Sequence, residues 1–267
     1  MVDAAHDLTD PAPAPGVIVF EQPLTERMRT FLRIEFLFEQ ASHHAKEATQ
    51  YGTRAAISSL LEVLTILNRG DIRAEVMKEL ERQSDLLERY RLTPGVDAAR
   101  LDELIGRLGS LRAELADAGP QLMNPFKECD FLNTVRHRSA IPGGTCAFDL
   151  PDYAYWLHQP YGERERQLGD WLAKLRRICD PVSQVLWLTR ETAQPVERTA
   201  PGGLYQHSLP RTEQFNIVRV LMPAHGGIFP EISAGQHRFN VRFVKWQGVE
   251  KRAVQVNHDM RFALGLS

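Results

Sequence analysis

The hydrophobic periodicity of this chain changes once, near Pro195, and that change constrains the fold more than any other feature. Before it, apolar residues recur every three or four positions, as on one face of an α-helix. After it, apolar and polar residues alternate, which is typical of antiparallel strands with one buried face. The sequence therefore predicts an α+β protein with a mainly helical bundle domain over residues 17–193 and a mostly antiparallel β domain over residues 194–267.

The helical part divides at its turn residues. The stretch LTERMRTFLRIEFLFEQ after Pro23 is so rich in apolar residues that its helix should be buried on most sides. Further helices are expected over about residues 53–68, after N-caps at Asp71 and Asp97, and over about 124–138. The pair Asp180-Pro181 resembles an N-cap followed by proline at the first helical position, so it predicts a break between two helices there.

A row of leucines follows Asp97 at alternating steps of three and four residues: Leu101, Leu104, Leu108, Leu111 and Leu115. This spacing is that of a short coiled coil. Two interpretations remain open at this point. The row either packs in an antiparallel helical hairpin of the same domain or forms a seam for self-association.

The N-terminal residues and the cysteines indicate the cellular compartment of the protein. Residues 1–16 lack the pattern of a signal peptide, and their Pro/Ala alternation predicts a disordered tail. Three cysteines without a CxxC pair favour neither a disulfide framework nor a structural zinc site, so a reducing cytoplasm is expected. Two short β-like segments, 17–20 and 145–148, could join the sheet of the β domain.

The stretch RSAIPGGTCAFDLP sets two glycines beside Cys146, with His137 and His158 nearby. A phosphate-binding loop would run from strand to helix and carry a lysine, whereas here a helix leads into the glycines and no lysine is near. A cysteine nucleophile would need a base and an oxyanion hole. We interpret the stretch as a structural corner, with a cysteine-dependent enzyme as the alternative.

Two other groups of polar residues lie on the first helix. His43 and His44 are adjacent, so their side chains should diverge, and they are interpreted as surface histidines that hold no metal. Arg33 and Glu35 lie among apolar residues, where a charge needs a partner or a helix edge. A structural ion pair or an edge position is the expected role.

The segment HRFNVRFVKW carries the clearest physical signal. Alternation along a strand places Arg238, Asn240 and Arg242 on one face and the apolar residues between them on the other. Two arginines on one face can bind carboxylates bidentately. Either an acidic partner or acids within the chain would neutralise them, and both interpretations stay open.

The charge is distributed unevenly. From Gln194 onward the chain has nine Lys and Arg against five Asp and Glu, although the whole chain has a net charge of −2. A basic C-terminal third suits an acidic partner. A nucleic-acid-binding module is the alternative function, but the near-neutral total and the lack of an aromatic-basic stripe count against it.

Several longer stretches together identify a family. FEQPLTERMRTFLRIEFLFEQ, NRGDIRAEVMKELERQ, VRHRSAIPGGTCAFDLPDYAYWLH and FPEISAGQHRFNVRFV resemble the ZapD family of cell division proteins, in order and with similar spacing. The resemblance implies a non-enzymatic homodimer without a cofactor, with a helical and a β domain. Such a dimer binds the C-terminal tail of FtsZ and cross-links FtsZ protofilaments into bundles at the division ring.

The resemblance also implies which residues bind the tail. The arginine of NRGD is Arg69, and the two arginines of HRFNVRF are Arg238 and Arg242, the pair that strand alternation singles out. The basic positions of VRHRSAIPGG are Arg136 and Arg138. Lys127 is also a candidate, although the chain has Asp130 where the family pattern is basic.

Overall fold

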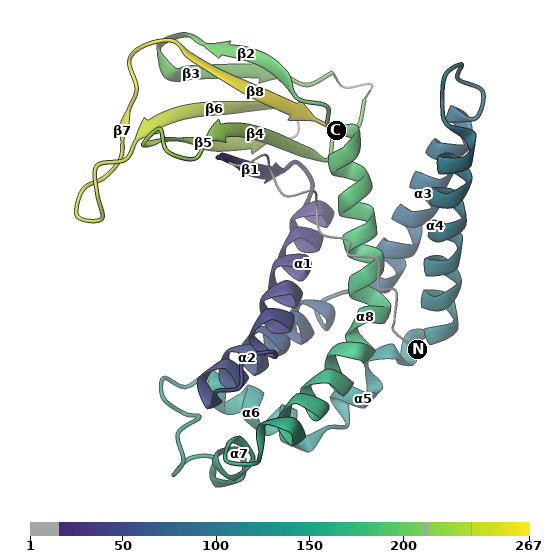
Figure 1. Ribbon diagram of the computed structural model, residues 1–267, viewed down its shortest axis with the longest axis vertical. Helices are drawn as coiled ribbons and strands as arrows, with labels where there is room; N and C mark the ends of the chain where they lie inside the picture. The colour runs from purple at the N-terminus through teal and green to yellow at the C-terminus, as the bar shows by residue number, and fades with distance from the viewer. Residues whose placement is uncertain (1–15, 211–212, 236) are drawn as a thin grey trace. The chain divides into compact units, whose positions relative to one another are not determined.

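The computed structural model describes residues 16–210, 213–235 and 237–267 (Figure 1). The tail expected at residues 1–16 therefore lies, apart from Gly16, outside the described residues. The chain divides into two compact units. The helical unit comprises Arg33–Val185, and the described part of the β unit comprises residues 16–32, 186–210, 213–235 and 237–267. The α+β class that the sequence predicts is confirmed.

The helices follow the chain in this order: α1 (Glu26–His44), α2 (Gln50–Leu67), α3 (Ile72–Tyr90), α4 (Ala98–Ala118), α5 (Asn124–Lys127), α6 (Asp130–Ser139), α7 (Pro151–Leu157) and α8 (Tyr161–Thr192). Both N-caps expected from the sequence are confirmed. Asp71 accepts a hydrogen bond from the backbone N–H of Ala74, and Asp97 accepts from those of Ala99 and Arg100. No helix in the described ranges is long and apolar enough to cross a membrane.

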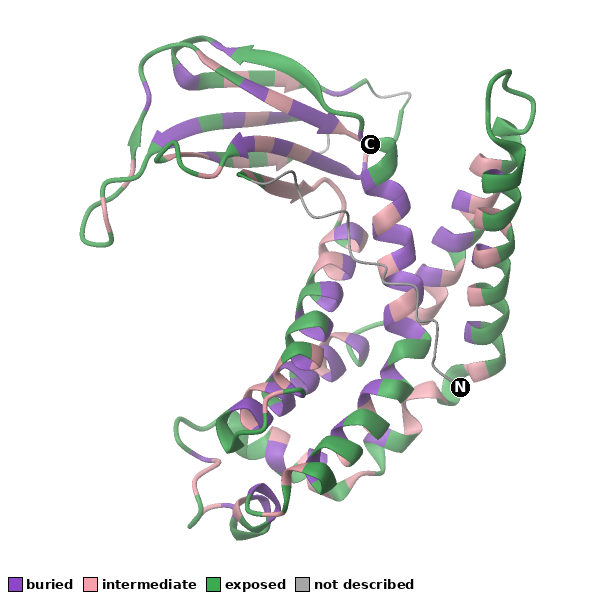
Figure 2. Cartoon of the chain, in the orientation of Figure 1, coloured by how far each residue is buried: buried purple, intermediate pink, exposed green. Residues whose placement is uncertain are grey.

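Helices α1 and α2 supply much of the core of the helical unit. Each buries one stripe and exposes the other, which Figure 2 shows as purple and green faces. On α1 the stripe includes Ile34, Leu37, Phe38 and Ala41, which are at most 8% exposed. Apolar burial of this kind stabilises the unit mainly through the hydrophobic effect.

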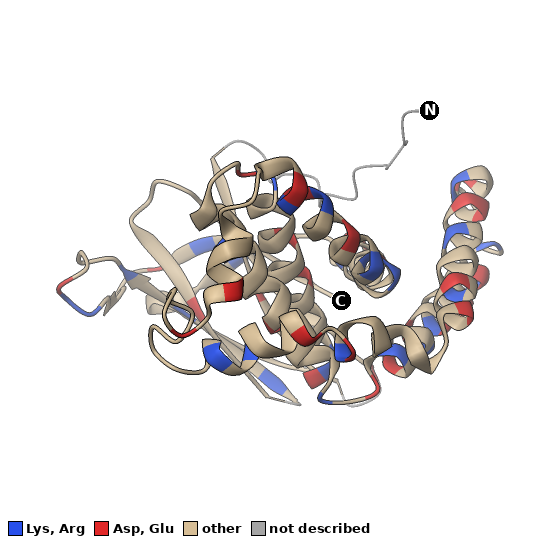
Figure 3. Ribbon diagram, turned by 90° about the horizontal axis from the view of Figure 1, so that it is seen from below, with Lys and Arg blue, Asp and Glu red and all other residues tan. Residues whose placement is uncertain are grey.

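Helices α3 and α4 form a hairpin within the chain. Leu101, Leu108 and Leu115 of α4 are buried. Arg73 of α3 donates from Nε to the carbonyl of Leu115, at 3.1 Å. Charged residues of both signs follow one another along both helices (Figure 3). The leucine row thus packs in a hairpin, the first of the two interpretations that the sequence left open.

The predicted break at Asp180-Pro181 is wrong, because α8 continues through Pro181. A proline inside a helix removes one backbone hydrogen bond and costs about 3 kcal/mol. Burial on both sides of Pro181 offsets this cost, since Ile178, Val182 and Val185 are at most 2% exposed. Tertiary packing therefore overrides the local signal.

Two further expectations in this region need correction. The helix expected over residues 124–138 is two helices, α5 and α6. The Asn133 side chain donates to the carbonyl of Lys127 at 2.7 Å and so satisfies the end of α5. Residues 145–148, expected as a possible strand, form turns. Backbone bonds from Cys146 to Gly143 and from Leu150 to Cys146 close these turns within the segment.

The β unit contains two antiparallel sheets. The first has the order β1 (Val17–Pro23), β4 (Ile217–Pro223), β8 (Met260–Leu266) and β2 (Val196–Ala200). The second has the order β3 (Leu204–Ser208), β6 (Arg238–Lys245) and β5 (Ile228–Gly235), and β7 (Val254–Gln255) also pairs with β6. The segment 17–20 thus lies in β1, which pairs with β4.

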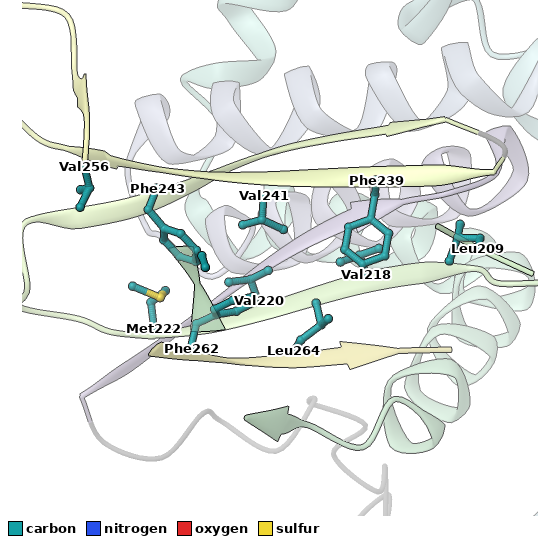
Figure 4. Packing of buried hydrophobic residues seen from close by; sticks show 11 residues of the cluster. Leu209, Val218, Val220, Met222, Phe239, Val241, Phe243, Val256, Phe262 and Leu264 are labelled. Carbon is teal, nitrogen blue, oxygen red and sulfur yellow. The ribbon is translucent and has the colours of Figure 1, made fainter. Parts of the chain in front are cut away.

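Side chains from both sheets meet in one core (Figure 4). The fully buried members include Val218 and Val220 of β4 and Phe239, Val241 and Phe243 of β6, all 0% exposed. Since successive strand residues face opposite ways, burial of these positions turns the residues between them outward. The register of β6 thereby sets which of its side chains a partner can reach.

Candidate functional site

The outward face of β6 carries the two arginines that the sequence singled out. Arg238 and Arg242 are exposed, whereas Phe239, Val241 and Phe243 are buried. Arg242 lies four positions after Arg238 along the strand, so the two Cα atoms are about 13 Å apart at a rise of about 3.3 Å per residue. The face can therefore bind two separate carboxylates of an extended peptide.

Arg242 has a partner within the chain. Its neighbour across the sheet is Glu231 of β5, and Arg242 Nε lies 3.0 Å from Glu231 Oε2. The Arg242 and Glu231 side chains are 51% and 46% exposed, so the pair is a surface ion pair of small net stability. For Arg242 the internal salt bridge is therefore real, and a ligand carboxylate would have to compete with Glu231.

Arg238 differs from Arg242 in this respect. It lies opposite Ser208 of β3 and Gly235 of β5, neither of which carries a charge. It is exposed and makes no ion pair with any residue that the structure describes. Leu204, 37% exposed, adds an apolar neighbour opposite Arg242 on the same face. This face combines an unneutralised cation with some apolar surface.

Arg69 lies in the helical unit, directly after the end of α2. It is exposed, and it borders a hollow of about 430 Å³ together with Arg33 and Phe36 of α1. Neither arginine forms an ion pair within the described ranges. The sequence predicts only a structural role for Arg33, in an ion pair or at a helix edge. The overlooked signal is the three-residue step from Arg33 to Phe36, which places both on one face of α1.

Lys127 of α5 lies near the segment that follows α2. It lines a second hollow, of about 300 Å³, with Asn68, Gly70 and Asp71. Residues 68–70 thus connect the two hollows, with Arg69 bordering one and Lys127 the other. The structure brings these two predicted residues to one corner of the helical unit.

Arg136 and Arg138 lie at the end of α6 and contact their own chain. Arg136 donates from Nη2 to Asn133 Oδ1 at 3.1 Å. Arg138 Nη1 lies 3.7 Å from Asp149 Oδ1, and its side chain is 47% exposed. Cations in the last turn also interact favourably with the helix dipole. These contacts favour a positioning role for both residues.

The corner around Cys146 is held by structural contacts. Cys146 Sγ donates to Asp149 Oδ2 at 3.5 Å, and Arg54 Nη1 donates to the carbonyl of Thr145 at 3.2 Å. A Cβ on Gly144 would lie 2.5 Å from the carbonyl oxygen of Arg138, so the turn requires glycine there.

Another cysteine, Cys179 of α8, lies outside this corner. Burial raises the pKa of the Cys179 thiol, which keeps it protonated.

His43 and His44 do not diverge as expected. The chain turns after α1 and places Glu47 within reach of both rings, with His44 Nδ1 2.9 Å and His43 Nε2 3.8 Å from Glu47 Oε1. One ligand atom from each of the three residues lies within 4.8 Å of the others, close enough to share a metal ion. The side chain of His43 is 77% exposed, that of His44 is 27% exposed and that of Glu47 is 42% exposed. The contact between His44 Nδ1 and Glu47 Oε1 has the length of a hydrogen bond.

The fold and these surfaces define a class: α+β proteins that present exposed arginines beside apolar surface on both an antiparallel sheet and a helical unit. Comparison with known proteins identifies the family. The ZapD cell division protein family matches residues 32–242, so this chain belongs to the ZapD family. The matched range includes Arg33, Arg69, Arg238 and Arg242.

Similar proteins come from several bacteria. A cell division protein ZapD from Methylococcus capsulatus is 34% identical over 247 residues, which cover 92% of this chain and 96% of the relative. A cell division protein ZapD from Klebsiella pneumoniae is 36% identical over 227 residues, which cover 85% of this chain and 90% of the relative. The family resemblance drawn from the sequence is confirmed.

Proposed function

We propose that this protein binds the C-terminal tail of FtsZ and, as a homodimer, cross-links FtsZ protofilaments into bundles at the division ring. Its membership of a cell division family supports this role. The observation that carries the proposal is the exposed, unneutralised guanidinium of Arg238 on the outward face of β6. A cation held in this way on a rigid strand is available to a carboxylate of a partner.

The tail is a flexible peptide with acidic and apolar residues. Its carboxylates bind the guanidiniums of Arg238 and Arg242 in bidentate geometry, and its apolar side chains contact neighbouring surface such as Leu204. Arg69 contributes a further cation in the helical unit. Arg238 contributes more than Arg242, because Glu231 already neutralises Arg242.

The remaining predicted residues act less directly. Lys127 adds positive charge near residues 68–71. Arg136 and Arg138 are positioning residues, since each already has a polar contact within the chain. Their removal should weaken tail binding less than removal of Arg238.

Bundling follows from the presence of two tail-binding subunits in one dimer. A single electrostatic contact of this kind is weak, because solvent and salt screen exposed charges. Each FtsZ polymer carries many tails, so a dimer bound at one tail finds the next at high effective concentration. Modest affinity for one tail is therefore sufficient for strong cross-linking.

Fluorescence anisotropy of a labelled FtsZ C-terminal tail peptide tests the proposal. The wild type should bind saturably, and Arg238→Glu/Arg242→Glu should weaken binding at least about 30-fold, since two charge-assisted contacts become repulsive. The matched control is Arg198→Glu/Arg261→Glu, which makes the same charge change at exposed positions of the other sheet. Circular dichroism checks that all variants are folded.

Equal loss in the control pair would attribute binding to net charge and contradict the placement on β6. No binding by the wild type would contradict the function itself. Glu231→Gln provides a test of opposite sign. Because it removes the carboxylate that competes for Arg242, it should tighten binding about two- to fivefold, a result that damage to the fold would not produce.

A further inference from the structure

The end of α1 and the segment that leads into α2 bring three side chains together, His43, His44 and Glu47, which we call the His–Glu cluster. Glu47 lies four positions after His43 and three after His44, and side chains at these spacings are neighbours on a helix. The two adjacent histidines converge because they present different ring nitrogens. His44 faces Glu47 Oε1 through Nδ1, at 2.9 Å, and His43 faces it through Nε2, at 3.8 Å.

The distances in the His–Glu cluster suit a tetrahedral zinc site. Zinc binds imidazole nitrogen and carboxylate oxygen at about 2.0–2.2 Å, so neighbouring ligand atoms of a tetrahedral site are about 3.4 Å apart. The two distances to Glu47 Oε1, 2.9 and 3.8 Å, lie on either side of this value, and the three ligand atoms are within 4.8 Å of one another. Small side-chain movements therefore bring all three to bonding distance of one ion.

Contacts with α8 hold the segment between α1 and α2 in place. The Tyr161 hydroxyl lies 3.1 Å from the carbonyl oxygen of Ala45. Arg164, which is only 4% exposed, donates from Nη1 to the carbonyl of Thr49 at 3.2 Å. Both ends of the segment that carries Glu47 are thus fixed to a third helix. Such preorganisation reduces the entropy that is lost when a ligand binds.

A glycine in the first turn of α2 makes room for the Glu47 side chain. A Cβ on Gly52 would lie 2.5 Å from Glu47 Cβ and 2.7 Å from Glu47 Oε2, which is too close for either contact. Glycine is less favourable in a helix than alanine, so the helix itself gains nothing from glycine at this position. The missing Cβ instead allows the carboxylate to lie against α2 with Oε1 toward both histidines.

We infer that the His–Glu cluster is a binding site for Zn²⁺, with His43 Nε2, His44 Nδ1 and Glu47 Oε1 as its ligands. Two imidazoles and one carboxylate suit zinc, whereas Mg²⁺ and Ca²⁺ favour oxygen ligands alone. Three protein ligands leave the fourth tetrahedral position to a water molecule. At His44 the ion replaces the hydrogen bond to Glu47, because a coordinating nitrogen carries no proton.

The ion links the last turn of α1 to the segment before α2, so it stabilises the folded helical unit. The sequence predicts that these histidines hold no metal, because adjacent side chains on a continuous helix diverge. The turn that brings Glu47 back to both rings is the feature that changes this expectation. Zinc binding at this turn does not depend on the proposed role in FtsZ bundling.

Competition with a chromophoric zinc chelator measures zinc binding to the full-length chain after metal has been removed. The wild type should bind one ion per chain at this site. His43→Gln, His44→Gln and Glu47→Gln should each weaken binding at least about tenfold, a loss that even changes to outer-shell partners cause. The matched controls are His137→Gln, in the last turn of α6, and Glu103→Gln, on α4. Both change exposed residues of the same types and should bind zinc as the wild type does.

Gly52→Ala tests the geometry with all three ligands intact. The added Cβ displaces the Glu47 side chain, so zinc binding should weaken at least about threefold, although alanine is the better helix former. Circular dichroism checks that the variants are folded. Saturating Zn²⁺ should also raise the denaturant midpoint of the wild type and leave that of His44→Gln unchanged.

The cysteines are the competing zinc ligands of this chain, and Co²⁺ distinguishes the two kinds of site. One equivalent of Co²⁺ at the His–Glu cluster should lack the intense near-ultraviolet charge-transfer band that thiolate ligands produce. Such a band, or zinc binding that the three ligand variants leave unchanged, would place the ion elsewhere and overturn the inference. No zinc binding by the wild type would overturn it as well. Loss of binding in the three ligand variants and in Gly52→Ala, with both controls unaffected, supports the site.

Discussion

A single carboxylate, Glu21, connects three elements of the β unit. Glu21 lies on β1, opposite Arg219 of β4, and Arg219 Nε is 2.9 Å from Glu21 Oε1. Arg190 near the end of α8 binds the same carboxylate, with Nη2 2.9 Å from Oε2. The three side chains are at most 18% exposed. Their role is therefore structural, unlike that of the exposed arginines of β6.

Glu21→Ala should lower the free energy of unfolding by about 3 kcal/mol or more, because it removes the carboxylate that both buried guanidiniums share. Chemical denaturation followed by circular dichroism measures the change. Glu197→Ala, at an exposed position of β2, is the control and should stay within about 0.5 kcal/mol of the wild type. A loss below about 1 kcal/mol for Glu21→Ala would show that the cluster contributes little.

Individual site residues differ in how far the sequence predicts them. The outward orientation of Arg238 and Arg242 follows from strand alternation and is confirmed. The pairing of Arg242 with Glu231 could not be predicted, since it depends on the register between β5 and β6. The neighbour of Arg33 across the hollow, Arg69, was missed for a similar reason, because Arg69 follows a second helix.

Among the elements, α8 shows most clearly how packing overrides a local signal. Pro181 lies within it, yet the helix continues for another eleven residues to Thr192. Pro181→Ala restores a backbone donor and relieves the clash of the ring with the preceding turn. It should raise the free energy of unfolding by about 1–3 kcal/mol in chemical denaturation. A decrease would mean that packing of the Pro181 ring stabilises the protein by more than its disturbance of the helix destabilises it.

The neighbouring Asp180 gives a pH-dependent prediction. Burial raises its pKa, with a smaller contribution from Glu114, while Arg176 and Arg107 oppose the rise. The folded state therefore disfavours the charged carboxylate, and stability is lost as the pH rises through the folded pKa. Asp180→Asn should unfold at higher denaturant concentration than the wild type at pH 7. The difference should vanish as the pH falls below the ordinary value of 3.8.

Most elements could be predicted from the sequence. The caps at Asp71 and Asp97 signal their helices locally, and alternation signals the strands. The predictions that were wrong concern segments whose local structure depends on a contact with another segment. Asn133 ends α5 by reaching Lys127, and Arg54 of α2 holds the turn at Thr145. No local pattern contains such contacts.

For the molecule as a whole, the proposed bundling depends on two tail-binding subunits in one particle. The protein should have about twice the 30.3 kDa mass of one chain in solution, as measured by light scattering. Excess free tail peptide should abolish pelleting of FtsZ bundles at low speed while single polymers remain, because it occupies both subunits. Bundling that persists at saturating peptide would contradict cross-linking through the tail.

Salt provides an independent test of the same assembly. Because the contacts are between exposed charges, bundling should fall steeply as ionic strength rises and the Debye length shortens from about 10 Å at 0.1 M to about 3 Å at 1 M. Pelleting over a salt series at constant FtsZ measures this dependence. Bundling unchanged to high salt would exclude an electrostatic mechanism.

The sequence by itself determined the α+β class, the helix caps and the face of β6 that carries Arg238 and Arg242, because each depends on local spacing. The family was identified from the sequence through the resemblance of longer stretches. Only the tertiary structure decided that α8 is continuous, that Glu231 neutralises Arg242 and leaves Arg238 available, and that Arg33, Phe36 and Arg69 border one pocket. These outcomes depend on contacts between segments far apart in the chain. Their energies come from burial and register, which local spacing does not encode.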